Sequence, residues 1–342
     1  MSEAKFDNLL RVLRREKPDR PTLFEFFLNG PFYEKLTGKI LGEEGRDWKF
    51  GKVNPIVTEA FAKAGYDYVT CHSTDMKFDA GTIEKKKTIS LNAGHAISDR
   101  ESFEKYPWPD PDACDYSDLD GAGNILPKNM KLIVYGPCGV LENAISLVGF
   151  ETLCMMLTDD PELTRSIFDA IGQRLLRYYE ISAAYDTVGA LISNDDWGFK
   201  TGTMLSPAQM RQYVFPWHRK IVSVIHAAGK PAILHSCGSL NEVMNDIIDN
   251  MKYDGKHSFE DTIVPVEQAY ELWGDRIAIL GGIDLDFVCR SKPGQIAERC
   301  RAMLAKTETR GGYALGTGNS VPEYVPYENY LVMIDCIRRK RN

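Results

Sequence analysis

The chain has 342 residues, of which 44% are hydrophobic, and a formal net charge of −7. This is the balance of a globular protein, and the acidic charge excludes a general nucleic-acid binder, because phosphate contacts need a basic surface. No apolar stretch has the length of about 18 residues needed to cross a bilayer. The N-terminal segment lacks the apolar core of a signal peptide, and the eight cysteines form no CxxC pair. We therefore expect a cytoplasmic protein with free thiols and no membrane partner.

Short apolar runs alternate with longer amphipathic segments along the chain. The runs have the length of buried parallel strands; they are Thr22–Phe27, Tyr66–Cys71, Lys131–Tyr135, Ala190–Ser193, Pro231–His235, Lys256–Phe259, Ile277–Leu280 and Tyr313–Leu315. The segments between them carry helix start signals; they are Pro55–Ala64, 161–185, 206–228, Ser239–Asn250, Pro265–Trp273, Pro293–Thr307 and Pro326–Arg338. This alternation predicts an α/β protein with one (β/α)8 TIM barrel domain over residues 1–342, since open doubly wound sheets usually stop near about six strands.

Two insertions interrupt the alternation, one after the first strand (Thr37–Gly51) and one after the second (from Thr74 to about Leu126). Residues 75–103 read as a strand pair laid over one face, and residues 108–123 are rich in turn residues. Because both insertions follow strands, we expect them on the catalytic rim, where long insertions act as lids or interfaces.

Polar residues follow the predicted strands, where a barrel of this kind carries its chemistry. We predict catalytic roles for Asp75, Asp195, Asp196, His257 and Asp284. We predict substrate contacts for Glu25, Asn29, His72, Tyr135, Thr317 and Asn319.

The sharpest local motif is Leu234-His235-Ser236-Cys237-Gly238. Strand side chains alternate with period two, so His235 and Cys237 project to the same side. Imidazole and thiolate are both zinc ligands, and the structural alternative is a buried histidine beside a cysteine that packs as a small apolar group.

Asp195 and Asp196 are adjacent, so they cannot both face the barrel. One of them can serve acid/base chemistry if burial raises its pKa, and the alternative is that they cap the following segment. Two glycines before Asp284 let the backbone approach a ligand. His257 fits a metal ligand, a substrate contact or a satisfied polar group equally well, and Gly316–Ser320 fits either an anion-binding nest or a plain turn.

From Asp195 to Asp335 the chain resembles the C-terminal half of the uroporphyrinogen decarboxylase superfamily, in the segments DDWG, LHSCGSL, LGGID and GTGNSVPEYVPYENYLVMI. The opening NLLRVLRREKPDRPTLFEFF also resembles the start of that family. The resemblance implies a (β/α)8 barrel and one of two chemistries. One is decarboxylation of a tetrapyrrole without a cofactor, and the other is zinc-assisted methyl transfer from a corrinoid protein to a thiol.

The decarboxylases carry an arginine pair after the first strand, but this chain has no arginine between Arg20 and Arg46. It also has Thr317 where they carry a histidine, and Asp75 matches their pyrrole-binding aspartate only loosely. These departures argue against authentic uroporphyrinogen decarboxylation.

The methyltransferases hold zinc with a His-x-Cys, which His235 and Cys237 match, and with a cysteine after the last strand, which Gly316–Ser320 lacks. A catalytic zinc usually has three protein ligands; the candidates for the third are Asp195, Asp196, His257, Asp284 and Glu25. The resemblance thus favours a methyltransferase that works with a corrinoid protein. The alternatives are a decarboxylase or other lyase acting on a carboxylated or tetrapyrrole substrate, and a corrinoid- or tetrapyrrole-binding protein without catalysis. In a metal-free enzyme His235 would be a general acid or base.

Overall fold

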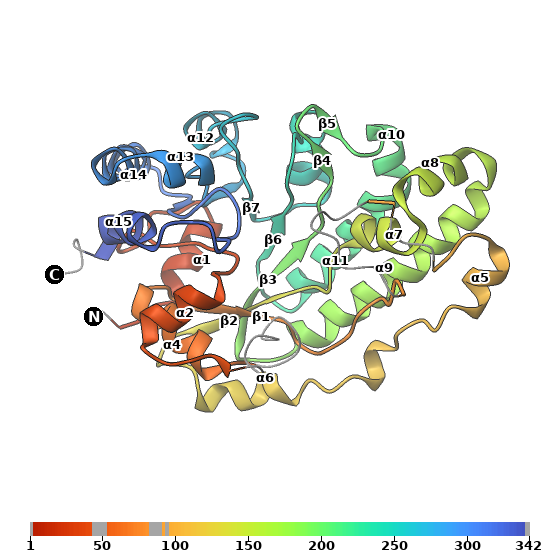
Figure 1. Ribbon diagram of the computed structural model, residues 1–342, viewed down its shortest axis with the longest axis horizontal. Helices are drawn as coiled ribbons and strands as arrows, with labels where there is room; N and C mark the ends of the chain where they lie inside the picture. The colour runs from red at the N-terminus through yellow and green to blue at the C-terminus, as the bar shows by residue number, and fades with distance from the viewer. Residues whose placement is uncertain (1–2, 43–52, 82–90, 93–95, 339–342) are drawn as a thin grey trace.

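The computed structural model describes residues 3–42, 53–81, 91–92 and 96–338 (Figure 1). Seven parallel strands form one curled sheet in chain order, each paired with the next. They are β1 (Tyr68–Cys71), β2 (Lys131–Tyr135), β3 (Val188–Asn194), β6 (Ala232–His235), β7 (Gly255–His257), β8 (Ala278–Leu280) and β9 (Tyr313–Ala314). Seven of the eight predicted strands are therefore confirmed.

The eighth prediction, Thr22–Phe27, is not confirmed as a strand. This segment contributes only a single parallel bridge, between Leu23 and Leu315 on the β9 side. On the β1 side the hydroxyl of Tyr68 accepts a hydrogen bond from the backbone N–H of Glu25 (2.6 Å) and donates one to its carbonyl (2.7 Å). A side chain thus occupies the space where paired strands would lie about 4.8 Å apart. The architecture shown is a curled seven-stranded parallel sheet, and a complete eight-stranded barrel is not confirmed.

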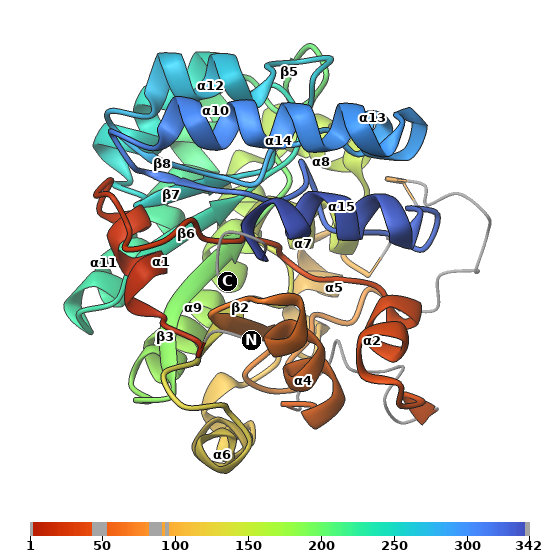
Figure 2. The same cartoon turned by 90° about the vertical axis from the view of Figure 1, so that its left-hand side faces the viewer.

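Helices cover the outside of the sheet, and α14 and α15 lie side by side (Figure 2). The helices are α1 (Asp7–Leu13), α2 (Gly30–Thr37), α4 (Pro55–Ala64), α5 (Arg100–Lys105), α6 (Ser117–Gly121), α7 (Val140–Val148), α8 (Phe150–Asp159), α9 (Pro161–Ala183), α10 (Pro207–Gln209), α11 (Phe215–Ala227), α12 (Val266–Trp273), α13 (Leu285–Arg290), α14 (Pro293–Thr307) and α15 (Tyr327–Arg338). No single helix in the described part of the chain has the length and apolar character of a membrane span; α7 and α8 reach them only as a pair bent by 96°.

Local sequence explains why α4 has its predicted bounds. The side chain of Asn54 accepts hydrogen bonds from the first backbone N–H groups, and Pro55 occupies the first helical position. Gly65 then ends the helix in the left-handed conformation at φ 99°, which a residue with a side chain rarely adopts. The elements that were not predicted are the helices α1, α2, α5, α6, α7, α8 and α13 and the short hairpin of β4 (Gly198–Phe199) and β5 (Gly202–Thr203).

Both predicted insertions lie partly outside the described residues, which exclude 43–52, 82–90 and 93–95. The described part of the longer insertion contains short helices and no strand pair. It packs along α9, where the guanidinium of Arg174 donates a hydrogen bond to the carbonyl of Pro109 (2.9 Å) and lies 4.8 Å from the ring of Trp108. In Figure 1, α5 lies at the outer end of the molecule beside α8 and α9. This part of the insertion therefore supports a flank of the sheet.

Candidate functional site

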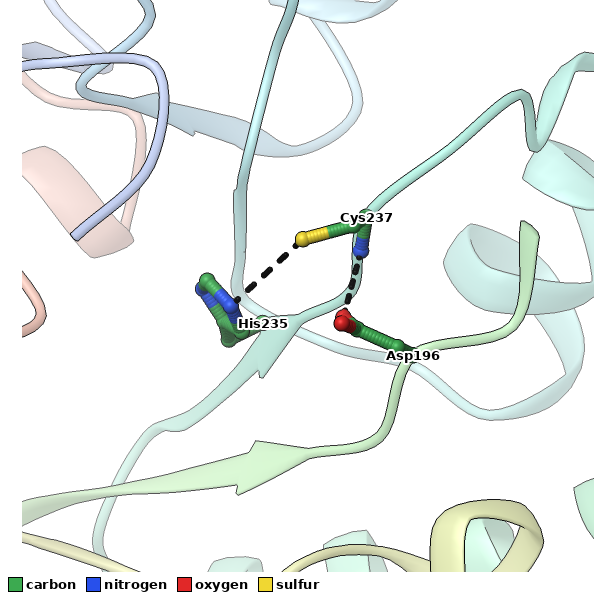
Figure 3. A group of neighbouring side chains, drawn as sticks. All are labelled: Asp196, His235 and Cys237. Carbon is green, nitrogen blue, oxygen red and sulfur yellow. Dashed lines mark hydrogen bonds between the residues drawn. The ribbon is translucent and has the colours of Figure 1, made fainter. Parts of the chain in front are cut away.

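Three side chains converge at the carboxyl ends of the two neighbouring strands β3 and β6 (Figure 3). His235 ends β6 and Cys237 follows two residues later, while Asp196 follows β3, which pairs with β6. One potential ligand atom from each residue lies within 4.8 Å of the other two. The backbone N–H of Cys237 donates to Asp196 Oδ1 at 2.9 Å, and His235 Nε2 lies 3.9 Å from the sulfur. An imidazole, a sulfur and a carboxylate thus face one another.

A chain of buried hydrogen bonds fixes the tautomer of His235. His257 Nε2 lies 3.1 Å from the carbonyl oxygen of Thr317, which can only accept, so this nitrogen carries the proton. His257 Nδ1 then accepts the proton of His235 Nδ1 at 2.8 Å. The remaining nitrogen of His235, Nε2, is left with its lone pair facing Cys237 and Asp196. An outer hydrogen bond of this kind typically orients a metal-binding histidine.

Burial keeps both imidazoles neutral. It lowers the pKa of His235 to about 3, with a further contribution from the nearby Lys256 ammonium. Burial also lowers the pKa of His257 well below its usual range, and the neighbouring His235 lowers it further. A neutral imidazole is the form that binds metals.

The sulfur of Cys237 lies among hydrogen-bond donors. Asn319 Nδ2 donates to it at 3.2 Å and the hydroxyl of Ser258 at 3.7 Å. Burial, followed by the Asp196 carboxylate, raises the pKa of the thiol to about 12. The side chain therefore keeps its proton at neutral pH until a cation replaces it. One nitrogen, one sulfur and one carboxylate oxygen, with their outer partners in place, fit the zinc donor set.

Asp195 belongs to a different network, directly beside this one. It is fully buried, and its two oxygens accept hydrogen bonds from the backbone N–H groups of Leu141 (3.0 Å) and Glu142 (2.9 Å) at the start of α7. His218 Nε2 is also 2.9 Å from Asp195 Oδ2. A side chain at Gly139 would collide with Asp195, since its Cβ would lie 2.1 Å away. The structure therefore places Asp196, and not Asp195, beside His235 and Cys237.

Two further groups, Glu142 and Cys138, lie near the cluster, and no role was predicted for either. Burial, followed by the negative charges of Asp195 and Asp196, raises the pKa of Glu142 on α7 to about 8. Cys138, just after β2, has a left-handed backbone at φ 61°, and burial of its thiol, followed by the charge of Glu142, raises its pKa. The place of Cys138 after a predicted strand indicates a residue of the candidate site, whereas Glu142 lies in a helix that the sequence did not predict.

An aromatic wall, made by the rings of His72, Tyr135 and Phe26, leads to the cluster. The ring centroids of His72 and Tyr135 are 4.0 Å apart, those of Tyr135 and Phe26 4.9 Å, and those of Phe26 and His235 4.5 Å. Two of the predicted substrate contacts, His72 and Tyr135, are thus linked to His235 through the ring of Phe26.

Other predicted site residues are held in structural contacts. Asn29 caps α2 through the N–H of Phe32, and Asp284 caps α13 through the N–H of Phe287. Glu25 is fully buried and its two oxygens contact Thr317, which is also fully buried. Asp75 is exposed beside Thr74. These contacts do not bring Asn29, Asp284, Glu25 or Asp75 to the cluster. Thr317 reaches it only through its carbonyl, which accepts from His257, whereas Asn319 and His257 are bonded directly to it.

The fold and this cluster define an α/β protein with a polar site at the carboxyl ends of parallel strands. The family model of uroporphyrinogen decarboxylase (URO-D) matches residues 126–340, and the chain belongs to this family. A solved methyltransferase from Methanosarcina mazei covers all of both chains with a TM-score of 0.73 at 16% identity, which shows the shared fold.

Curated relatives divide between two activities. A protein of Methanosarcina mazei named methylated-thiol–coenzyme M methyltransferase is 26% identical over 184 residues, which are 54% of this chain and 46% of that protein. The uroporphyrinogen decarboxylase of Citrifermentans bemidjiense is also 26% identical, over 195 residues, which are 56% of this chain and 53% of that enzyme. The chain thus spans about half the length of these two relatives.

Proposed function

We propose that the protein is a zinc-dependent methyltransferase that moves a methyl group from the corrinoid of a partner protein to a thiol. The observation that carries this proposal is the convergence of Asp196, His235 and Cys237. The methyltransferases that the sequence resembles take their third zinc ligand from a cysteine after the last strand. Here the carboxylate of Asp196, from the neighbouring strand β3, would serve in its place.

The chain's own residues would prepare the site for the cation. His257 and Thr317 hold His235 with Nε2 free to bind, and Asn319 and Ser258 orient the sulfur of Cys237. The aromatic wall borders the site on one side and would limit the access of water. Bound there, zinc would lower the pKa of the incoming thiol.

The overall reaction balances without an oxidant. The acceptor thiol loses its proton and its sulfur forms a bond with the methyl carbon. The carbon–cobalt bond of the corrinoid breaks, and its electron pair stays on cobalt. The acceptor leaves as a thioether.

The test combines metal analysis with turnover. Protein purified without chelator should contain one zinc per chain, and it should demethylate methylcobalamin in the presence of a small thiol such as 2-mercaptoethanol. His235→Ala should lose both properties. His226→Ala is the matched control, because this exposed histidine on α11 pairs with Asp254 and is not part of the cluster.

The outcomes separate the possible functions. Zinc-free wild-type protein that decarboxylates a carboxylated substrate would replace the proposal with a lyase. Binding of cobalamin or porphyrin without turnover of any thiol would indicate a binding protein. Unchanged zinc content and turnover in His235→Ala would exclude the proposed centre.

A further inference from the structure

A buried carboxyl group, that of Glu25, lies where segment 22–27 meets the residues that follow β9. Glu25 is fully buried. Its Oε1 accepts the backbone N–H of Thr317 at 2.7 Å, and its Oε2 lies 2.6 Å from the Thr317 hydroxyl oxygen. That hydroxyl oxygen also lies 2.5 Å from the carbonyl oxygen of Asn319. The Thr317 hydroxyl thus has two oxygen neighbours at hydrogen-bond distance.

Counting protons decides the state of the carboxyl group. The Thr317 hydroxyl has one proton, and the Asn319 carbonyl has none to offer. With Glu25 ionised, one of the two short oxygen–oxygen contacts would contain no proton and would be repulsive. With Glu25 protonated, its Oε2–H donates to the Thr317 hydroxyl, which in turn donates to Asn319. Only the neutral acid satisfies both contacts.

The surroundings of the carboxyl agree with this count. The hydroxyl groups of four buried tyrosines, Tyr33, Tyr66, Tyr68 and Tyr330, lie close enough to interact electrostatically with it. No lysine or arginine of the described chain forms an ion pair with it, and burial raises its pKa to about 8. An ionised carboxylate without a counter-charge is costly in such a place.

We propose that Glu25 is a neutral carboxylic acid that positions the turn after β9, and through it the candidate metal centre. The carbonyl of Thr317 accepts from His257, which sets the tautomer of His235. The side chain of Asn319 donates to the sulfur of Cys237. Two of the outer contacts of the cluster, from His257 to His235 and from Asn319 to Cys237, therefore depend on the two residues that the Glu25 proton chain connects.

The carboxyl group of Glu25 also connects segment 22–27 to the segment that follows β9. Segment 22–27 has one bridge to Leu315, and beyond it the N–H of Thr317 bonds to the side chain of Glu25. Gly316 lies so close to the segment that an added Cβ would be 1.7 Å from the carbonyl oxygen of Phe24. Backbone pairing between the two segments stops at Leu315. Beyond that residue, the side chain of Glu25 provides the next hydrogen bond between them.

Infrared spectroscopy of the full-length, zinc-free protein at neutral pH tests the protonation directly. We expect a carbonyl stretching band of a protonated carboxylic acid that disappears in Glu25→Gln. Glu142→Gln is the matched control, because the pKa of Glu142 is also raised to about 8. The band lost with Glu25→Gln must remain in Glu142→Gln. Absence of any band that depends on Glu25 would overturn the proposal.

Zinc affinity tests the positioning role, and this arm alone rests on the proposed function. Glutamine offers the same oxygen acceptor and an N–H donor in place of the acid O–H, so Glu25→Gln should bind zinc like the wild type. Glu25→Ala should lower the affinity by about 10–100-fold, the usual effect of losing an outer contact of a metal ligand. Failure of Glu25→Gln to fold, or an affinity as low as that of Glu25→Ala, would contradict the proposal. If no variant binds zinc but the infrared band depends on Glu25, the proposed function is wrong and the neutral acid stands.

Discussion

Asp195 and Asp196 are neighbours in the chain, yet they belong to two hydrogen-bond networks with opposite properties. The carboxylate of Asp195 is fully buried and is bonded to the start of α7 and to His218, whose other nitrogen lies 2.8 Å from the hydroxyl of Tyr253. Asp196 is partly exposed, and its carboxylate faces the imidazole of His235 and the thiol of Cys237.

The difference between the two networks indicates which of them stabilises the fold and which can bind a ligand. The oxygens of Asp195 are bonded to protein donors, so this network connects β3, α7 and α11. In the Asp196 cluster the protonated thiol of Cys237 faces the free nitrogen lone pair of His235 and the carboxylate of Asp196, three groups that fit the zinc donor set once that proton leaves. The first network is therefore expected to govern stability, and the second to govern binding.

The largest effect should come from breaking the Asp195 network. Asp195→Ala leaves two buried N–H groups and His218 without their acceptor. We expect the free energy of unfolding to fall by about 3–5 kcal/mol, as when one partner of a buried pair is removed. Urea denaturation measures this loss. Asp196→Ala is the control, with an expected loss of about 1 kcal/mol or less; equal losses in both variants would erase the distinction.

A second prediction concerns zinc binding. Asp196→Ala should weaken it more than the change of an outer contact does, and therefore by over about 100-fold. Asp195→Ala, assayed below its unfolding temperature, should retain most of the affinity. Competition with a chromophoric chelator measures both variants. If Asp195→Ala weakened zinc binding more than Asp196→Ala, Asp195 and not Asp196 would be the ligand, and the prediction would be wrong.

The third prediction tests the histidine relay. His257→Phe keeps a ring but removes the acceptor of the His235 Nδ1 proton. We expect zinc affinity to fall by about 10–100-fold while the zinc content at saturation stays at one. An unchanged affinity in the same chelator assay would show that the tautomer of His235 needs no support.

The smallest effect is a dependence on pH. The pKa of the Cys237 thiol is raised to about 12 and that of His235 is lowered to about 3. Near neutral pH zinc must therefore displace a proton from the sulfur and none from the imidazole. The apparent affinity should rise by about tenfold for each unit of increasing pH. Calorimetry in buffers of different ionisation enthalpy counts the protons; release of none, or of two, would contradict this assignment.

Periodicity and strand length were enough to predict seven strands, because each is a buried run between helices. They failed at Thr22–Phe27, where the hydroxyl of Tyr68 takes the place of a backbone ladder. Glu25 and Tyr68 are 43 positions apart, and a contact over that distance produces no periodic pattern in the sequence.

The site was predictable to the same degree. The His-x-Cys spacing indicated two candidate ligands, on the expectation that both lie in a strand. In the structure β6 ends at His235, and the backbone N–H of Cys237 is held by Asp196 instead. The choice between Asp195 and Asp196 was not predictable, since both lie past the strand end, where α7 and β6 determine which carboxylate turns inward. The relay through His257 depends on three strands that meet only in the folded protein.

The central claim is that Asp196, His235 and Cys237 together bind one zinc ion. X-ray absorption spectroscopy at the zinc edge, on protein loaded with one equivalent of zinc, tests it most directly. The account predicts a single sulfur neighbour, with nitrogen and oxygen completing the shell, and loss of the oxygen contribution from the protein in Asp196→Ala. Two or more sulfur neighbours, or a spectrum unchanged in Cys237→Ala, would contradict it.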